Sequence, residues 1–170
     1  MKSNSFTPKT FYPYIVLLFL MFVIGSCKKN NSDGSNVTYE MSFMANGEKV
    51  VYTLQAALVA TFSNTGDQYT GAFVGSDSNS NMELQVFDNQ DISKKAYVGY
   101  TTSGTILVGV LMSYTDRIGT LYSQAGENVV VTITSIAYAS VSGTFSGTLK
   151  ASGKPDMAIT DGKFTVKRIN

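Results

Sequence analysis

The segment from residue 77 to residue 88 has the spacing of a calcium-binding loop. Oxygen-bearing side chains fall at its first, third, fifth and twelfth positions, which are Asp77, Asn79, Asn81 and Asp88. In such loops the oxygens converge on one ion, and the sixth position is glycine because the backbone turns sharply there. Here that position is Met82, and Glu83 to Phe87 has the composition of a strand. A solvated turn before a strand is the favoured interpretation, and we predict no metal ligand.

Two loop aspartates, Asp88 and Asp91, could act together as the catalytic carboxylates of a hydrolase. Glycosidases hold two carboxyl groups on either side of the bond that they cleave. Loop aspartates are also ordinary turn formers, so neither residue is assigned a catalytic role. The chain has no histidine and a single cysteine, which excludes imidazole catalysis, Ser-His-Asp triads, histidine-ligated metals and an internal disulfide. We predict neither an enzyme nor a cofactor.

Tyrosine is the residue type best suited to hold a ligand in this chain. Its ring has an apolar face and a polar tip, so it can stack on a sugar or anchor a protein partner. Tryptophan is absent, and the tyrosines of the central and C-terminal segments are Tyr97, Tyr100, Tyr114, Tyr122 and Tyr138. Strands also use tyrosine for packing, so core positions are favoured for this group. Tyr97, Tyr100 and Tyr114 are kept as candidate ligand-binding residues.

The single cysteine, Cys27, follows a segment built like an export signal. The segment begins with a basic part that holds Lys2 and Lys9. An apolar core of eleven residues follows from Tyr14 to Ile24, and the small pair Gly25-Ser26 precedes the cysteine. Eleven residues are too few for a membrane span, which needs roughly 20. We therefore predict a cleaved signal peptide over residues 1–26.

The tetrapeptide Ile24-Gly25-Ser26-Cys27 resembles the lipobox of bacterial lipoproteins, with isoleucine where leucine is usual. The resemblance implies that the Cys27 sulfur carries a diacylglyceryl group. Several acyl chains hold a protein stably on a membrane, whereas one chain holds it weakly. We expect lipidation of Cys27 and anchoring to a membrane. An ordinary secretory signal or an uncleaved anchor is the alternative, and either would leave Cys27 unmodified.

The mature chain is expected to be one domain on a short tether. Residues 27–36 carry the cysteine and a polar stretch with nothing apolar to bury, and residues 37–170 are long enough for one core. Loss of Lys2 and Lys9 changes 13 basic and 12 acidic residues to 11 against 12, a net charge of −1. Bulk charge therefore gives no attraction to nucleic acid.

From residue 37 onward, short segments rich in Val, Ile, Thr, Tyr and Phe alternate with clusters of Gly, Asn, Asp and Ser. This pattern predicts an all-β domain, a single antiparallel β-sandwich with a flattened β-barrel as the alternative. The clearest element is a hairpin at Asn46-Gly47, a dipeptide preferred in type I′ turns. That turn fixes the register and sets apolar residues opposite one another. The implied pairs are Phe43–Val50, Met41–Tyr52 and Tyr39–Leu54.

A second hairpin, with its turn near Ser103-Gly104, has apolar residues on both faces. Val98 and Tyr100 lie on one face, and Tyr97 and Val110 lie on the other. Such strands are normally covered on both sides, which favours a central position in the fold. An apolar surface or a cavity that awaits a partner is the alternative.

The C-terminal part predicts three further features. Residues 141–150 alternate as a half-buried strand, in which Gly143 and Gly147 leave room for large neighbours. The apolar phase flips at Asp161-Gly162, which predicts a β-bulge or tight turn with Gly162 at positive φ. Residues 113–124 partly fit helical spacing, but their glycine, threonine and neighbouring strands favour extended chain.

Several segments together resemble a family of small all-β lipoproteins of the Bacteroidota. They are Val131–Thr134, Val141–Leu149, Ile159–Phe164, the Asn46-Gly47 hairpin and the Cys27-Lys-Lys-Asn-Asn leader. The resemblance covers most of the mature chain. It implies an all-β lipoprotein with no established activity and no catalytic residues to carry over. Surface export in that phylum tends to follow acidic residues soon after the cysteine, whereas Lys28 and Lys29 come first here.

We therefore expect a lipid-anchored protein of the cell envelope, in the outer membrane, with its periplasmic or surface face left open. Its expected role is a non-enzymatic binding or structural module for an envelope protein or a glycan. A hydrolase that uses carboxylates alone is the first alternative. A β-barrel that carries an apolar ligand is the second, and it requires a closed cavity lined by the two-sided hairpin.

Overall fold

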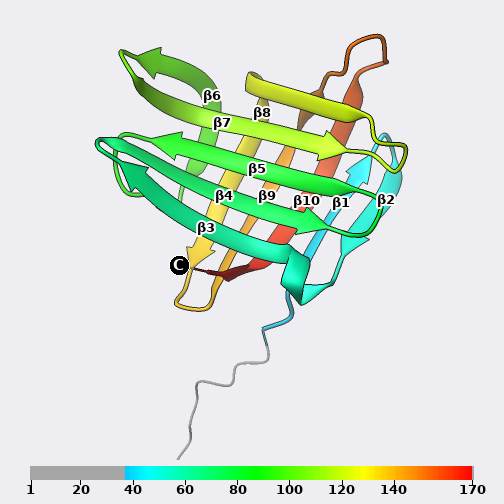
Figure 1. The fold of residues 1–170 in the computed structure, drawn as a ribbon, viewed down its shortest axis with the longest axis horizontal. Helices are drawn as coiled ribbons and strands as arrows, with labels where there is room; N and C mark the ends of the chain where they lie inside the picture. Colours follow the sequence, from blue (N-terminus) through cyan, green and yellow to red (C-terminus); the bar gives the residue numbers. More distant parts are fainter. Residues whose placement is uncertain (1–36, 170) are drawn as a thin grey trace, which may run out of the picture. The chain divides into compact units, whose positions relative to one another are not determined.

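The computed structural model describes residues 37–169, which form one unit built from a ten-stranded sheet (Figure 1). A single 3-10 turn, η1 (Gln55–Ala57), interrupts the strands. The strands are β1 (Glu40–Ala45), β2 (Glu48–Tyr52), β3 (Leu58–Thr65), β4 (Gln68–Ser76), β5 (Asn81–Asp88), β6 (Ala96–Ser103), β7 (Ile106–Thr115), β8 (Leu121–Ile136), β9 (Ser140–Leu149) and β10 (Met157–Arg168).

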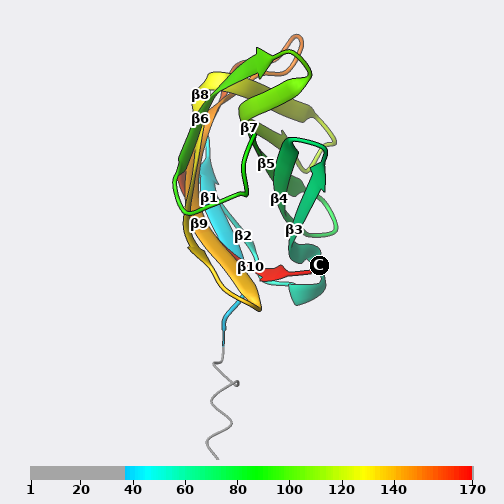
Figure 2. The same cartoon turned by 90° about the vertical axis from the view of Figure 1, so that its left-hand side faces the viewer.

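The sheet folds into two layers that face one another, as Figure 2 shows edge-on. One layer contains β3, β4, β5 and β7, and the other contains β1, β2, β8, β9 and β10, while β6 pairs with both β7 and β8. The layers join on one side through β7–β8 and on the other through a short parallel pairing of β10 with β3. All other pairings are antiparallel, so the predicted sandwich is confirmed and takes the form of a flattened barrel.

The first hairpin has the predicted register. Phe43 pairs with Val50 and Met41 pairs with Tyr52, and the turn residues have the positive φ angles of a type I′ turn, 48° at Asn46 and 85° at Gly47. The outermost predicted pair, Tyr39–Leu54, is wrong. Strand β2 ends at Tyr52, and the chain bends into η1 with the Leu54 side chain 63% exposed.

The second hairpin differs from its prediction in two ways. Ser103 pairs with Ile106, so the turn residues are Gly104 and Thr105 rather than Ser103 and Gly104. The face that bears Tyr97 and Val110 is buried, but on the other face Val98 and Tyr100 are exposed at 59% and 39%. The prediction that this hairpin is covered on both sides is therefore wrong. Strand β6 has one face toward the core and the other toward solvent.

The C-terminal strands confirm the predicted alternation. In β9, Val141, Phe145 and Leu149 are buried, and Gly143 gives room to the Phe164 ring of β10. A register shift in β10 between Ile159 and Gly162 is the predicted bulge. The positive φ belongs to Asp161, at 55°, and not to Gly162.

Residues 113–124 contain a turn between two strands rather than one extended run. Strand β7 ends at Thr115 and β8 begins at Leu121. Between them the Asp116 carboxylate accepts hydrogen bonds from the backbone N–H groups of Ile118 and Thr120, at 3.0 and 2.8 Å. This local bonding closes the turn and exposes Ile118, whose side chain is 80% accessible.

Aromatic rings from both layers fill the space between them. Phe73 of β4 stacks on Phe164 of β10, with ring centroids 5.0 Å apart. Phe43 of β1 meets Tyr114 of β7 edge-on at 5.4 Å and Phe145 of β9 at 5.6 Å. These contacts occupy the region in which a carrier of an apolar ligand would need open volume.

Candidate functional site

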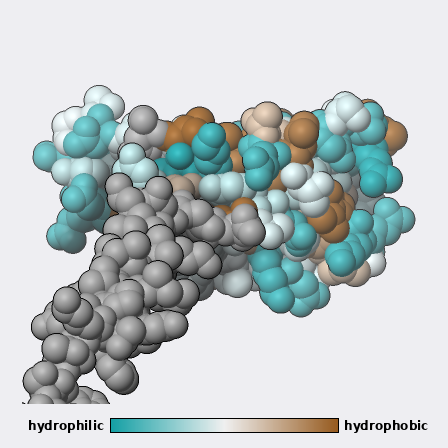
Figure 3. Space-filling model, turned by 90° about the horizontal axis from the view of Figure 1, so that it is seen from below, coloured by the Kyte–Doolittle hydropathy of each residue, from teal (hydrophilic) through white to brown (hydrophobic). Residues whose placement is uncertain are grey.

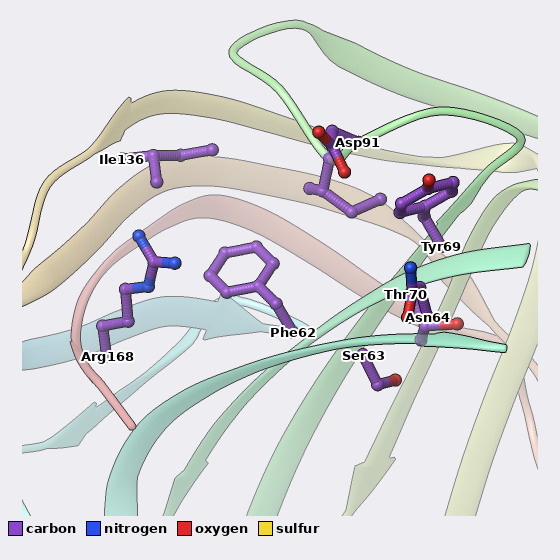
Figure 4. A pocket seen from close by; sticks show the side chains of 9 residues that line it. Phe62, Ser63, Asn64, Tyr69, Thr70, Asp91, Ile136 and Arg168 are labelled. Carbon is purple, nitrogen blue, oxygen red and sulfur yellow. The ribbon is translucent and has the colours of Figure 1, made fainter. Parts of the chain in front are cut away.

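A pocket of about 440 Å³ opens at one end of the sandwich, where the strands of the two layers separate (Figure 4). Residues from five segments line it. These segments are β3, β4, the β5–β6 loop, the end of β8 and the end of β10. The lining side chains that the argument uses are Phe62, Asn64, Tyr69, Asp91, Ile136 and Arg168.

The Arg168 side chain forms one wall of the pocket and is held against an aromatic ring. Its guanidinium carbon lies 5.1 Å from the centroid of the Phe62 ring, which is a cation–π contact. The Phe62 ring is itself fixed edge-on against Phe73 at 6.0 Å, so it is continuous with the core. At the end of β10, the Arg168 backbone N–H donates to the Ala139 carbonyl. The positive charge is therefore held at a defined place before any ligand arrives.

The rest of the pocket combines hydroxyl, amide and carboxylate groups with apolar ones. Asn64 and Tyr69 lie on neighbouring strands, because Asn64 of β3 pairs with Tyr69 of β4. Asp91 is exposed in the β5–β6 loop and lies across the Phe62 ring from Arg168 in the view of Figure 4. Ile92 and Ile136 supply apolar surface and pack against the core. Such a lining suits a ligand with hydroxyl groups, an apolar face and a negative charge.

The predicted pair of aspartates does not form a joint acidic site. The Asp88 side chain is 5% exposed and forms an ion pair with Lys95, 2.5 Å away, whereas Asp91 is exposed in the pocket. One Asp88 oxygen accepts a hydrogen bond from the Asn89 backbone, and the ion pair with Asp88 raises the pKa of Lys95. Asp88 is thus a structural group whose carboxylate is already engaged.

The calcium-like spacing has a different explanation. Asp77 lies before β5 and Asp88 lies at its far end, so the two carboxylates are separated by the length of the strand. The Asp77 carboxylate accepts from the backbone N–H groups of Asn79 and Ser80, both at 2.8 Å. These bonds, the first above all, lower the pKa of Asp77. Within residues 37–169 no group of three or more acidic, histidine or cysteine side chains is placed to hold a metal.

The candidate tyrosines do not meet at one surface. Tyr97 and Tyr114 are 3% and 4% exposed, and both belong to the core, as does Tyr122. The Tyr97 hydroxyl accepts from the Ser93 backbone N–H at 2.9 Å. Of the three candidate ligand-binding tyrosines, Tyr97, Tyr100 and Tyr114, Tyr100 alone is exposed, and Tyr138 projects from the β8–β9 turn with 98% of its surface accessible.

Sequence reasoning found only Asp91 among the pocket residues. Arg168 is one of two arginines, and no sequence motif around it indicates a role in ligand binding. Phe62 has the appearance of an ordinary strand residue. The pocket depends on the meeting of β3 with β10, which are about 100 positions apart and pair through only two residue pairs. No local pattern reports such a contact.

Comparisons with known proteins add no relative, because the chain matches no family model, no curated protein and no solved structure. The predicted lipidation site, Cys27, lies outside the described residues, as do the predicted signal segment and tether. In residues 37–169 no helix is long and apolar enough to cross a membrane.

Proposed function

We propose that the protein is a lipid-anchored binding module of the cell envelope, and that the pocket at Arg168 holds a glycan that carries an acidic group. The observation that carries this proposal is the guanidinium group fixed over the Phe62 ring beside hydroxyl and amide side chains. A guanidinium group binds a carboxylate through two parallel hydrogen bonds. Hydroxyl and amide groups suit sugar hydroxyls, and the apolar lining suits the face of a sugar ring.

Binding is favoured over hydrolysis because, among residues 37–169, Asp91 is the one carboxylate that lines this pocket. Hydrolysis by carboxylates alone needs an acid and a base or nucleophile on opposite sides of the scissile bond. In this pocket Asp91 is exposed, but Asp88 is buried and paired with Lys95. Asp91 without a second carboxylate can accept hydrogen bonds from a bound ligand.

Membrane anchoring rests on the sequence around Cys27. The apolar segment, the small residues and the single cysteine are in the order of a lipoprotein signal. Metabolic labelling with a fatty acid tests this part of the proposal. Wild-type protein is expected to incorporate the label, and Cys27→Ser is expected to lose it. Equal labelling of both proteins would refute lipidation at Cys27.

Titration calorimetry with uronic-acid oligosaccharides, and with neutral oligosaccharides of equal length, tests the pocket. We expect the acidic sugars to bind better, and Arg168→Gln to weaken them by roughly 10-fold to 100-fold, since a charged hydrogen bond contributes about 1.5–3 kcal/mol. Arg117→Gln is the matched control, because Arg117 is the other arginine and lies exposed in the β7–β8 turn. Equal loss in both variants, or no preference for acidic sugars, would contradict the assignment.

A further inference from the structure

The described chain enters the sandwich at the end that carries the β8–β9 turn. The Tyr39 hydroxyl, two residues after the start of the described chain, donates to the Ala139 carbonyl at 3.2 Å. The same carbonyl accepts from the Arg168 backbone at the end of β10. Three segments far apart in sequence therefore meet where the chain enters, and Figures 1 and 2 both place them at this end.

This end combines an exposed aromatic side chain with positive charge. Tyr138 is 98% exposed at the tip of the turn, and Lys167 is exposed on the neighbouring strand end. A hollow of about 350 Å³ lies between them, bounded by Tyr138, Ala139, Lys167 and Arg168. Within residues 37–169 no carboxylate forms an ion pair with Lys167. In the view onto this end, apolar patches lie among hydrophilic ones (Figure 3).

The length of chain before residue 37 limits how far this end can lie from a lipid on Cys27. Position 37 lies ten residues after Cys27. Any chain of that length reaches at most about 35 Å when fully extended, and a random coil of ten residues spans about 17 Å on average. That average is close to the radius of gyration of roughly 14 Å for a domain of this size. A lipid on Cys27 would therefore keep the end at which the chain enters next to the membrane surface.

We propose that this end docks on an anionic lipid surface, with Tyr138 at the level of the headgroups and Lys167 beside a lipid phosphate. The inference rests on the lipid anchor of the proposed function. An aromatic ring with a polar tip is suited to the membrane interface, and a lysine near an anionic surface contributes about 1 kcal/mol. Lys28 and Lys29 directly follow the lipidated cysteine and add to the same attraction.

The far end of the molecule supplies a matched control. Ile118 is 80% exposed in the β7–β8 turn, next to the exposed Arg117. This turn shares a hollow with Asn46, which lies at the opposite end of β1 from the point of chain entry. It thus presents a large apolar side chain and a cation, but away from the tether. If an exposed large side chain and a cation were sufficient, both ends would bind an anionic membrane. If the tether to Cys27 decides, only the end at which the chain enters should bind.

Fluorescence quenching by lipid-borne nitroxides tests the docking. Cys27 is the only cysteine and its sulfur would carry the lipid, so a fluorophore on Ala137→Cys or on Leu121→Cys labels one position of the full lipidated chain and keeps Arg117 and Ile118. In vesicles of phosphatidylcholine and phosphatidylglycerol, we expect strong quenching at position 137 and little at position 121. Adding Lys167→Gln should lower the docked-to-undocked ratio about fivefold. Adding Tyr138→Ser should lower it further, and pure phosphatidylcholine should remove the effect of Lys167→Gln.

Two failures of this experiment are distinguishable. Mass spectrometry of the mature chain reports the lipid on Cys27 independently of the fluorophore. An unmodified Cys27 would overturn the anchor and the docking together. A lipidated Cys27 with equal quenching at positions 137 and 121, weak or strong, would overturn the docking alone.

Discussion

The Phe164 ring occupies the space in which a side chain at Gly143 would lie. A Cβ atom at Gly143 would stand 2.5 Å from the Cζ atom of that ring and would also press on the Thr132 carbonyl oxygen. The ring in turn stacks on Phe73 of the opposite layer. One missing side chain in β9 therefore allows the two layers to join through aromatic contacts, since close packing leaves no other room for the ring.

Gly143→Ala is expected to destabilise the domain by about 1–3 kcal/mol, the range typical of overpacked cores. The added methyl group must displace either the Phe164 ring or the backbone of β8, and the ring is held by Phe73. Chemical denaturation of both proteins measures the change. Thr144→Ala is the control, because its side chain is exposed on the other face of β9, and we expect a change below about 1 kcal/mol. Equal stability of Gly143→Ala and wild type would show that the ring can move without cost.

Substitutions at two adjacent residues in the bulge of β10 should change the stability of the domain in opposite directions. Asp161 has a φ of 55°, a region that favours glycine, so Asp161→Gly should leave stability unchanged or raise it by up to about 1 kcal/mol. Gly162 has ordinary φ, but a Cβ there would meet Phe145, with 2.6 Å to its Cδ2 atom. Gly162→Ala should therefore cost about 1–3 kcal/mol. Thermal denaturation measures the stability of the two variants. A Gly162→Ala variant more stable than Asp161→Gly would contradict this account of the bulge.

Alkaline pH should destabilise the domain through Tyr52. Burial raises the pKa of the Tyr52 hydroxyl above its ordinary value of 10.0, although its bond to Ser80 lowers it in part. The folded state thus keeps the proton that the unfolded state releases, so the free energy of unfolding is unaffected below pH 10 and falls above it. Each such group contributes up to about 1.4 kcal/mol per pH unit.

Tyr52→Phe isolates this contribution. The variant should lose about 1 kcal/mol at neutral pH, because the 2.9 Å hydrogen bond to Ser80 is absent. Above pH 10 its free energy of unfolding should fall less steeply than that of wild type, by up to about 1.4 kcal/mol per pH unit. Denaturation curves over a series of alkaline pH values give both slopes. Parallel slopes would show that the Tyr52 hydroxyl ionises equally in both states.

Local sequence patterns predicted the parts of the fold that local chemistry determines. The Asn46-Gly47 turn fixed the register of β1 on β2, because its type sets which residues face one another. Alternation identified the buried face of β9, and the phase flip at Asp161 located the bulge of β10. The positive φ angle was predicted for Gly162 but belongs to Asp161. Glycine is needed at position 162 because a side chain there would meet Phe145.

The pocket could not be predicted, because its geometry arises from contacts distant in sequence. Phe62 and Arg168 are brought together by the parallel pairing of β10 with β3, which joins the two layers. The prediction that the candidate tyrosines bind a ligand failed for a related reason. Tyr97 and Tyr114 fit the β pattern equally as core and as surface residues, and only the position of the opposite layer decides between these environments.

The side chain of Gln68 joins β4, β5 and β7, which belong to one layer. From the start of β4, its amide nitrogen lies 3.0–3.2 Å from carbonyl oxygens of Tyr69, Asp88 and Leu107. Its amide oxygen accepts from the Leu107 backbone N–H at 2.5 Å. This position lies where the β6–β7 hairpin extends beyond the pairing of β5 with β7, which ends at Gly109. The glutamine thus supplies the hydrogen bonds that a neighbouring strand would otherwise make.

Replacement of Gln68 should therefore loosen the β6–β7 hairpin. Gln68→Leu preserves approximate size but leaves the half-buried Leu107 N–H without its acceptor, and we expect a loss of about 1–3 kcal/mol. Gln68→Glu keeps an acceptor for that N–H but sets a carboxylate oxygen against the three carbonyl oxygens, so its loss of stability should be at least as large. Hydrogen exchange at the Leu107 amide separates the cases, with the fastest exchange in Gln68→Leu. Unchanged protection in Gln68→Leu would show that pairing with Thr102 alone holds this strand.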